Sequence, residues 1–209
     1  MGPPKGRVVK VLAVLVLFAW IARVEAAVQP LRPDEVPEAL ARVAHANRIY
    51  DRDMTVRQEY DVRALLMRWQ FTGTVRKEGA EAHVELQGAP SFFPEDLSTT
   101  LFDVAQWLET FDVEYQGLEA VEGRTHHVFR GEPRRDDGSS TRWGTIWVDP
   151  ETFLIDRILV QYWWGRVTIQ QGFRTEGEYV LLDRQSARID PLGIRAEVRW
   201  KDYRFVDRR

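Results

Sequence analysis

The side chains best suited to acid–base or metal chemistry in this chain are its four histidines, and their spacing does not favour a shared site. His126 and His127 are adjacent on an expected strand, where consecutive side chains point to opposite faces, so they cannot bind one metal together. His45 and His83 lie on an expected helix and on another expected strand. The sequence has neither the His-x-His nor the His-Glu-x-x-His spacing of metal sites. We therefore expect no metal site.

Nucleophilic and phosphate chemistry have as little support. The chain contains no cysteine, which excludes disulfides, thiolate ligands and a thiol nucleophile. It has neither a Gly-x-Ser-x-Gly elbow nor a glycine-rich phosphate loop. Asp149 suits the first position of a turn, and Glu95 and Asp96 suit the first turn of a helix, so we interpret all three as structural. No catalytic residue and no cofactor are expected.

Large apolar side chains are the remaining candidates for a site. The chain has eight tryptophans, and four of them lie on expected strands that are apolar on both sides. Two interpretations stay open: these residues fill an ordinary core, or they line an internal apolar pocket. Such a pocket would suit acyl chains, since each CH2 removed from water contributes about 0.8 kcal/mol without requiring a particular geometry. The candidate pocket residues are Trp69, Phe71, Trp143, Trp147, Ile155, Leu159, Trp163 and Trp200.

The segment from Trp143 to Leu159 predicts two strands joined by a turn at Asp149-Pro150. By alternation, Trp143 and Trp147 share one face of the first strand, while Ile146 and Val148 share the other. A sheet that is apolar on both sides needs cover on both sides. A helix, another sheet or an apolar ligand could provide the second cover.

Two later strands differ in pattern. From Ile155 to Trp164, alternation groups Ile155, Leu159 and Trp163 on one face and leaves the other face apolar as well. From Ile194 to Lys201, apolar and charged residues alternate strictly, which indicates one packed face and one wet face.

Two helices and two meanders should position these residues. Apolar residues three or four apart predict a helix that begins after Asp34, its expected N-cap, and reaches Tyr50. Residues 55–86 alternate as three strands, and a second helix is expected from Pro94 to Leu108. Regular turn signals between Val113 and Phe205 then predict an antiparallel meander.

The first 26 residues have the layout of a secretory signal peptide, with basic residues, an apolar run and Val24-Glu25-Ala26 before Ala27. The alternative is an uncleaved anchor. We expect a signal peptide over 1–26, a linker over 27–33 and one soluble domain over 34–209, located in the periplasm or secreted after cleavage near Ala26. Cleavage removes four basic residues and one acidic residue, which takes the formal net charge from -3 to -6. Scattered arginines in an acidic chain give no support for nucleic-acid binding.

The order of these elements resembles the LolA/LolB-like superfamily of periplasmic lipoprotein carriers, their receptors and related lipid-binding domains. The resemblance covers roughly residues 34–206 and centres on Trp147-Val148-Asp149-Pro150-Glu151-Thr152, followed by Ile155-Asp156-Arg157. It implies an α+β fold that is mainly antiparallel β. The sheet would be a strongly curved, incomplete β-barrel, with an N-terminal helix and a short internal helix packed on its concave face.

The same resemblance implies that the concave face holds a lipid or the acyl chain of a lipoprotein. Peripheral contact with a membrane is a separate possibility. The alternative is a sensor or scaffold domain of the same fold that binds an envelope protein and has a packed interior. Two departures separate this chain from the best-known branches. It has no acceptor cysteine for lipid anchoring. The arginine that locks the lid of the carrier cannot be assigned to one position among Arg57, Arg63, Arg68 and Arg76.

Overall fold

The computed structural model describes residues 28–47, 53–79, 81–91, 104–134, 141–177 and 179–206. The proposed signal peptide and the start of the second predicted helix lie outside these ranges. Two helices and ten strands are described: α2 (Val36–Ala46), β1 (Met54–Ala64), β2 (Met67–Glu78), β3 (Glu81–Gln87), α4 (Val104–Thr110), β4 (Phe111–Val121), β5 (Arg124–Pro133), β6 (Thr141–Val148), β7 (Ile155–Tyr162), β8 (Gly165–Glu176), β9 (Tyr179–Asp190) and β10 (Ile194–Phe205).

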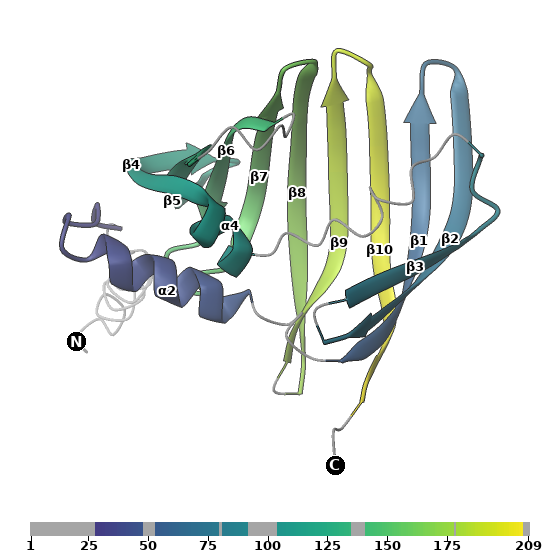
Figure 1. The fold of residues 1–209 in the computed structure, drawn as a ribbon, viewed down its shortest axis with the longest axis horizontal. Coiled ribbons are helices and arrows are strands. Elements are labelled where there is room, and N and C mark those ends of the chain that lie inside the picture. Colours follow the sequence, from purple (N-terminus) through teal and green to yellow (C-terminus); the bar gives the residue numbers. More distant parts are fainter. Residues whose placement is uncertain are drawn as a thin grey trace, which may run out of the picture.

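All ten strands form one curved antiparallel sheet that is not closed into a barrel (Figure 1). Their order is β3-β2-β1-β10-β9-β8-β7-β6-β5-β4, so the last strand pairs with the first and joins the two predicted meanders. The sequence-based fold prediction is thus confirmed. None of the helices that the structure describes is long and apolar enough to cross a membrane.

Helices α2 and α4 pack on the same face of the sheet, which we call the inner face. Ala39 and Val43 of α2 and Trp107 of α4 belong to one core cluster with Ile146 and Ile158 of the sheet. The strand residues of this cluster come from β4 to β8. The helices therefore cover one half of the inner face, as an apolar helical stripe against an apolar sheet requires.

The start of α2 differs from the prediction. Asp34 is not its N-cap: Glu35 occupies that position and makes no side-chain capping bond. The Glu35 carboxylate instead accepts hydrogen bonds from the backbone and side-chain nitrogens of Arg32, each at 2.8 Å. Pro37, within the first two helical positions, is preset for helix by its fixed φ. The helix thus begins without the expected side-chain cap, at a proline whose φ already suits it.

The strand β7 contains a bulge that changes which side chains share a face. Val148 pairs with Ile155, but Trp147 pairs with Arg157, so Asp156 is an extra residue. Ile155 consequently joins the inner core with Ile158, whereas Leu159 alternates onto the opposite, outer face. The predicted grouping of Ile155 with Leu159 is wrong for this reason.

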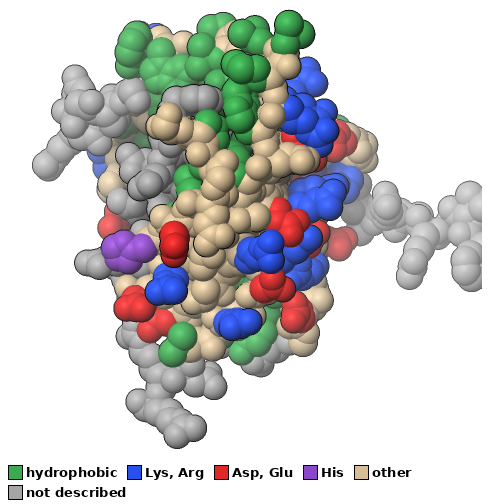
Figure 2. Space-filling model, turned by 90° about the vertical axis from the view of Figure 1, so that its right-hand side faces the viewer, with side chains coloured by type: hydrophobic (Ala, Val, Ile, Leu, Met, Phe, Trp, Pro, Cys, Tyr) green, Lys and Arg blue, Asp and Glu red, His purple; other side chains and the backbone are tan. Residues whose placement is uncertain are grey.

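The outer face is covered by charged side chains. The guanidinium of Arg130 lies 4.4 Å from the ring centre of Trp143, and that of Arg157 lies 4.8 Å from the ring centre of Trp147. The Trp147 indole N–H also donates to Glu119 at 2.9 Å. In Figure 2 charged side chains gather along the flank that corresponds to this face. Arginine stems and cation–π contacts thus provide the second cover that the hairpin requires.

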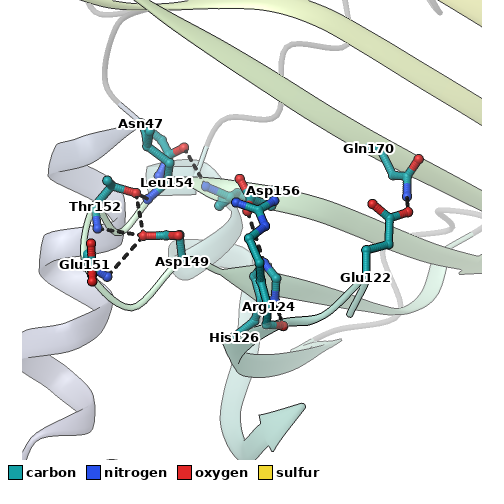
Figure 3. A network of polar contacts seen from close by, with 11 residues as sticks. Asn47, Glu122, Arg124, His126, Asp149, Glu151, Thr152, Leu154, Asp156 and Gln170 are labelled. Carbon is teal, nitrogen blue, oxygen red and sulfur yellow. Dashed lines mark hydrogen bonds and ion pairs between the residues drawn. The ribbon is translucent and has the colours of Figure 1, made fainter. Parts of the chain in front are cut away.

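The loop between β6 and β7 is fixed to the end of α2 (Figure 3). The carboxylate of Asp149 accepts from the backbone N–H of Glu151 at 3.0 Å and from the N–H and hydroxyl of Thr152 at 2.8 and 2.9 Å. Asn47 donates to the carbonyl of Phe153 at 2.9 Å and accepts from the N–H of Ile155 at 3.2 Å. The predicted turn role of Asp149 is confirmed.

Replacing Asp149 by alanine should lower the free energy of unfolding by about 1–3 kcal/mol, because three donors lose a charged acceptor. Burial alone would raise the pKa of Asp149, but hydrogen bonds from Thr152 and Glu151 and the charge of Arg124 outweigh it and lower that pKa. The stability of the ionised form is present above the unfolded pKa of about 4 and is lost as pH falls through the lower folded value.

Urea denaturation at pH 7 and at pH 3 measures both effects. The control is Glu151→Ala, since Glu151 is exposed and supplies its backbone N–H to the same turn. Equal destabilisation by the two substitutions would contradict this role of the Asp149 carboxylate.

Candidate functional site

Four of the eight candidate pocket residues lie on the inner face. Phe71 and Trp200 are buried, and Trp69 is half-buried, all in the half formed by β1, β2 and β10. Ile155 is also buried but packs in the other half, beneath the helices. The structure therefore brings together three aromatic candidates in one region and leaves Ile155 apart from them.

The other four candidates lie elsewhere. Trp143, Trp147 and Leu159 are on the outer face, among the arginines described above. Trp163 is 72% exposed in the turn between β7 and β8. Sequence alternation grouped Trp143 with Trp147 correctly but did not say which face is inner, and the β7 bulge places Leu159 on the face opposite to Ile155.

The inner half that holds the aromatic candidates is an apolar surface, which we call the β1–β2–β10 surface. Its buried members come from β1 and β2, and half-buried residues of β2, β3, β10 and the segment after β3 pack against them. No helix residue of the described ranges belongs to this cluster. Its members are Tyr60, Val62, Trp69, Phe71, Leu86, Ala89, Ile194, Ala196 and Val198.

Strand pairing and one glycine shape this surface. Tyr60 pairs with Phe71 across β1 and β2, and their rings stack with centroids 4.7 Å apart. A Cβ at Gly73 would lie 3.2 Å from the Tyr60 ring and 3.1 Å from Leu86, closer than ordinary contact. Glycine therefore leaves room for the Tyr60 ring beside Leu86 in this buried cluster.

The polar groups on this half of the inner face are paired with each other. The Tyr60 hydroxyl donates to the side-chain oxygen of Gln58 at 2.5 Å, and Gln58 is 1% exposed. The Trp200 indole N–H donates to the side-chain oxygen of Gln185 at 3.1 Å. Buried polar groups that are satisfied in this way do not oppose an apolar environment. The surface is suited to hydrocarbon rather than to acid–base chemistry.

Sequence reasoning missed a polar network on the outer face, shown in Figure 3. His126, 2% exposed, contacts one carboxylate oxygen of Asp156 at 3.0 Å, and Arg124 contacts the same oxygen at 2.9 Å. The other ring nitrogen of His126 lies 3.0 Å from the carbonyl oxygen of Arg124. The network connects β5 to β7 across β6, and the β7 bulge positions its carboxylate. Only knowledge of that bulge would have revealed it from the sequence.

His127 contacts a different partner from His126, in agreement with strand alternation. Its Nδ1 lies 3.0 Å from the Tyr115 hydroxyl, and the two rings are 5.7 Å apart. Burial lowers the pKa of His127. Among the ranges that the structure describes, no group of three or more His, Cys, Asp or Glu residues could hold a metal ion.

Because the folded pKa of His127 is lowered, the unfolded chain binds the proton more tightly. Stability should therefore fall as pH drops below the unfolded value of about 6.5 and approaches the folded value. Urea denaturation of the parent chain and of His127→Gln at pH 7.5 and 5.5 tests this. The parent should lose more stability than the variant between the two pH values, and an equal loss would contradict a buried neutral imidazole.

No protein-family model matches the sequence, and no curated protein sequence matches it. Solved structures do match the fold. A LolA superfamily protein from Nitrosomonas europaea aligns with a TM-score of 0.61 at 15% identity, covering 88% of this chain and 96% of that one. A DUF1329 family protein from Desulfovibrio piger aligns with a TM-score of 0.60 at 11% identity, covering 81% and 92%.

A domain from Vibrio parahaemolyticus, assigned to outer membrane lipoprotein sorting, aligns with a TM-score of 0.58. Its identity to this chain is 12%, and the alignment covers 81% of this chain and 92% of the domain. At these identities the likeness establishes the fold alone. The chain has a LolA-like fold, which confirms the resemblance found in the sequence.

Proposed function

We propose that this chain is a non-enzymatic envelope protein that binds or shuttles a lipid, or the acyl chain of a lipoprotein, on its inner face. Residues 1–26 would serve as the export signal, cleaved near Ala26, and residues 27–33 as a linker to a single domain over 34–209. The ligand-binding part would be the β1–β2–β10 surface together with Trp200.

The observation that carries the proposal is the composition of that surface. It joins aromatic and aliphatic side chains from four strands, its polar groups are paired, and its cluster contains no described helix residue. An acyl chain of sixteen carbons placed there would gain about 0.8 kcal/mol for each CH2 removed from water. Such binding is non-directional, which is consistent with a site without reactive side chains.

The fold supports the same proposal. A LolA superfamily protein and a domain assigned to outer membrane lipoprotein sorting align with this fold at TM-scores of 0.61 and 0.58. An open sheet leaves its inner face accessible from the edges, whereas a closed barrel would admit a ligand only through its ends. Loading and release of a long chain are simpler on the open form.

Mass spectrometry of an organic extract tests the proposal directly. The full chain, purified from an expressing cell, should yield bound lipid in near-stoichiometric amount. It should also shift the emission of an apolar dye to the blue, and fatty acid should displace that dye. Absence of both lipid and dye binding would contradict the carrier proposal and favour a packed domain that binds an envelope protein.

A matched pair of tryptophan substitutions tests the location of the ligand. Trp69→Ala removes an inner-face ring, and Trp143→Ala removes an outer-face ring of the same type. Loss of contact equivalent to about two CH2 groups predicts that Trp69→Ala weakens fatty-acid binding roughly tenfold. Trp143→Ala should leave the affinity unchanged, and circular dichroism establishes that both variants are folded. Equal weakening by both would place the ligand elsewhere.

A further inference from the structure

Five large apolar side chains are exposed on three hairpins of the sheet. Leu65 is 90% exposed, Leu66 fully exposed and Met67 56% exposed in the β1–β2 hairpin. Trp163, in the β7–β8 turn, is 72% exposed, and Leu192, in the β9–β10 turn, is 56% exposed. Single exposed apolar residues are ordinary, but a gathering of large ones marks an interaction surface.

The strand register brings these three hairpins to the same end of the strands. Arg63 pairs with Arg195, so β1 ends where β10 begins, and Arg166 pairs with Asp190, so β8 begins where β9 ends. In Figure 1 all three turns lie at the top of the sheet, and Figure 2 shows hydrophobic side chains gathered there. We call residues 65–67, 163 and 192 the hairpin rim.

Folding alone does not account for leucines in the first of these turns. Leu65 has a φ of 53°, in the left-handed region where glycine or asparagine is the favoured residue. A leucine there is strained, and at 90% exposure it gains little from burial. The turn therefore carries a residue that opposes both local geometry and solubility, a combination expected at binding sites.

Arginines lie directly beneath the rim on the outer face. Arg68, Arg63, Arg195 and Arg188 are in register across four adjacent strands. Like charges that face each other across strands are destabilising, so this row costs stability in the isolated protein. Both Arg63 and Arg68 pair with the single carboxylate of Asp61.

Two arginines also share one carboxylate beneath the other two hairpins. Arg188 and Arg166 share the carboxylate of Asp190, at 2.9 and 3.5 Å. These arginines, with Arg195 and Arg157, line an open groove of about 360 Å³. The Nε of Arg157 is buried and has no hydrogen-bond partner in the part of the chain that the structure describes. Two cations for each acid leave a net positive belt below an apolar tip.

We propose that the hairpin rim docks on an anionic lipid bilayer. The leucines and Trp163 enter the interfacial region, where apolar and amphipathic aromatic side chains are stabilised. The arginine belt then lies at the depth of the phosphate groups, which guanidinium binds through paired hydrogen bonds. Anionic headgroups would relieve the repulsion within the row. The hairpin rim lies at one end of the strands, so its docking on a bilayer does not depend on what the inner face binds.

Site-specific labelling tests the contact in the full chain, because a chain without native cysteine allows a single introduced cysteine to be labelled alone. Leu66→Cys and Leu192→Cys carry an environment-sensitive fluorophore, and Thr175→Cys, exposed near the opposite end of β8, is the control. Vesicles of phosphatidylcholine with about one-third phosphatidylglycerol should shift the rim labels to the blue and leave the control unchanged.

Three results would overturn the proposal. The rim labels could fail to shift, or the control could shift equally, which would indicate contact through another part of the chain. A shift that appears with rising protein concentration in the absence of vesicles would assign the rim to a second copy of this chain.

A charge-matched pair tests the arginine belt. Arg63→Gln combined with Arg195→Gln removes two facing cations, while Arg68 still pairs with Asp61, so the fold should be retained. At about 1 kcal/mol for each basic residue near an anionic surface, vesicle affinity should fall roughly thirtyfold. The control, Arg57→Gln with Arg204→Gln, removes the same charge far from the rim. Equal losses would attribute binding to net charge and refute the belt.

Discussion

Side chains alternate across ten antiparallel strands in one continuous hydrogen-bonded sheet, and this alternation gives the sheet an apolar inner face and a charged outer face. The packing of both faces depends on this alternation. The helices cover the inner face at β4 to β8, arginine side chains cover the outer-face tryptophans, and the β1–β2–β10 surface forms its own cluster. A single bulge at Asp156 decides that Ile155 packs inward while Leu159 faces outward.

Much of this architecture follows from sequence patterns. Period-two alternation and turn residues predicted the meanders, and the turn role of Asp149 is confirmed by three hydrogen bonds to its carboxylate. The rest depends on long-range contacts. Alternation could not assign Trp143 and Trp147 to the outer face, because their cover is provided by arginines of neighbouring strands. Likewise, the contact of His126 with Asp156 crosses an intervening strand and needs a bulge that no local signal marks.

The two proposed sites are adjacent in the sheet. Trp69 of the inner surface is two residues from Met67 of the rim, and Ile194 is two residues from Leu192. An acyl chain that leaves a bilayer at the hairpin rim would therefore reach the β1–β2–β10 surface within a short distance along β2 and β10. If both proposals hold, the end of the sheet that contacts the membrane is also the end at which an acyl chain would enter or leave. The two proposed sites suit different parts of a lipid. Phosphate groups would lie with the arginines of the outer face, and hydrocarbon with the aromatic residues of the inner face.

Photo-crosslinking tests the central claim, that hydrocarbon lies on the inner face at β1, β2 and β10. A fatty acid with a diazirine near the end of its chain is bound to the full protein and irradiated, and the labelled residues are identified by peptide mass spectrometry. Labels are expected on inner-face positions such as Tyr60, Phe71 and Val198. Labels confined to the outer-face residues Trp143, Trp147 and Leu159, or no label that fatty acid competes away, would contradict it.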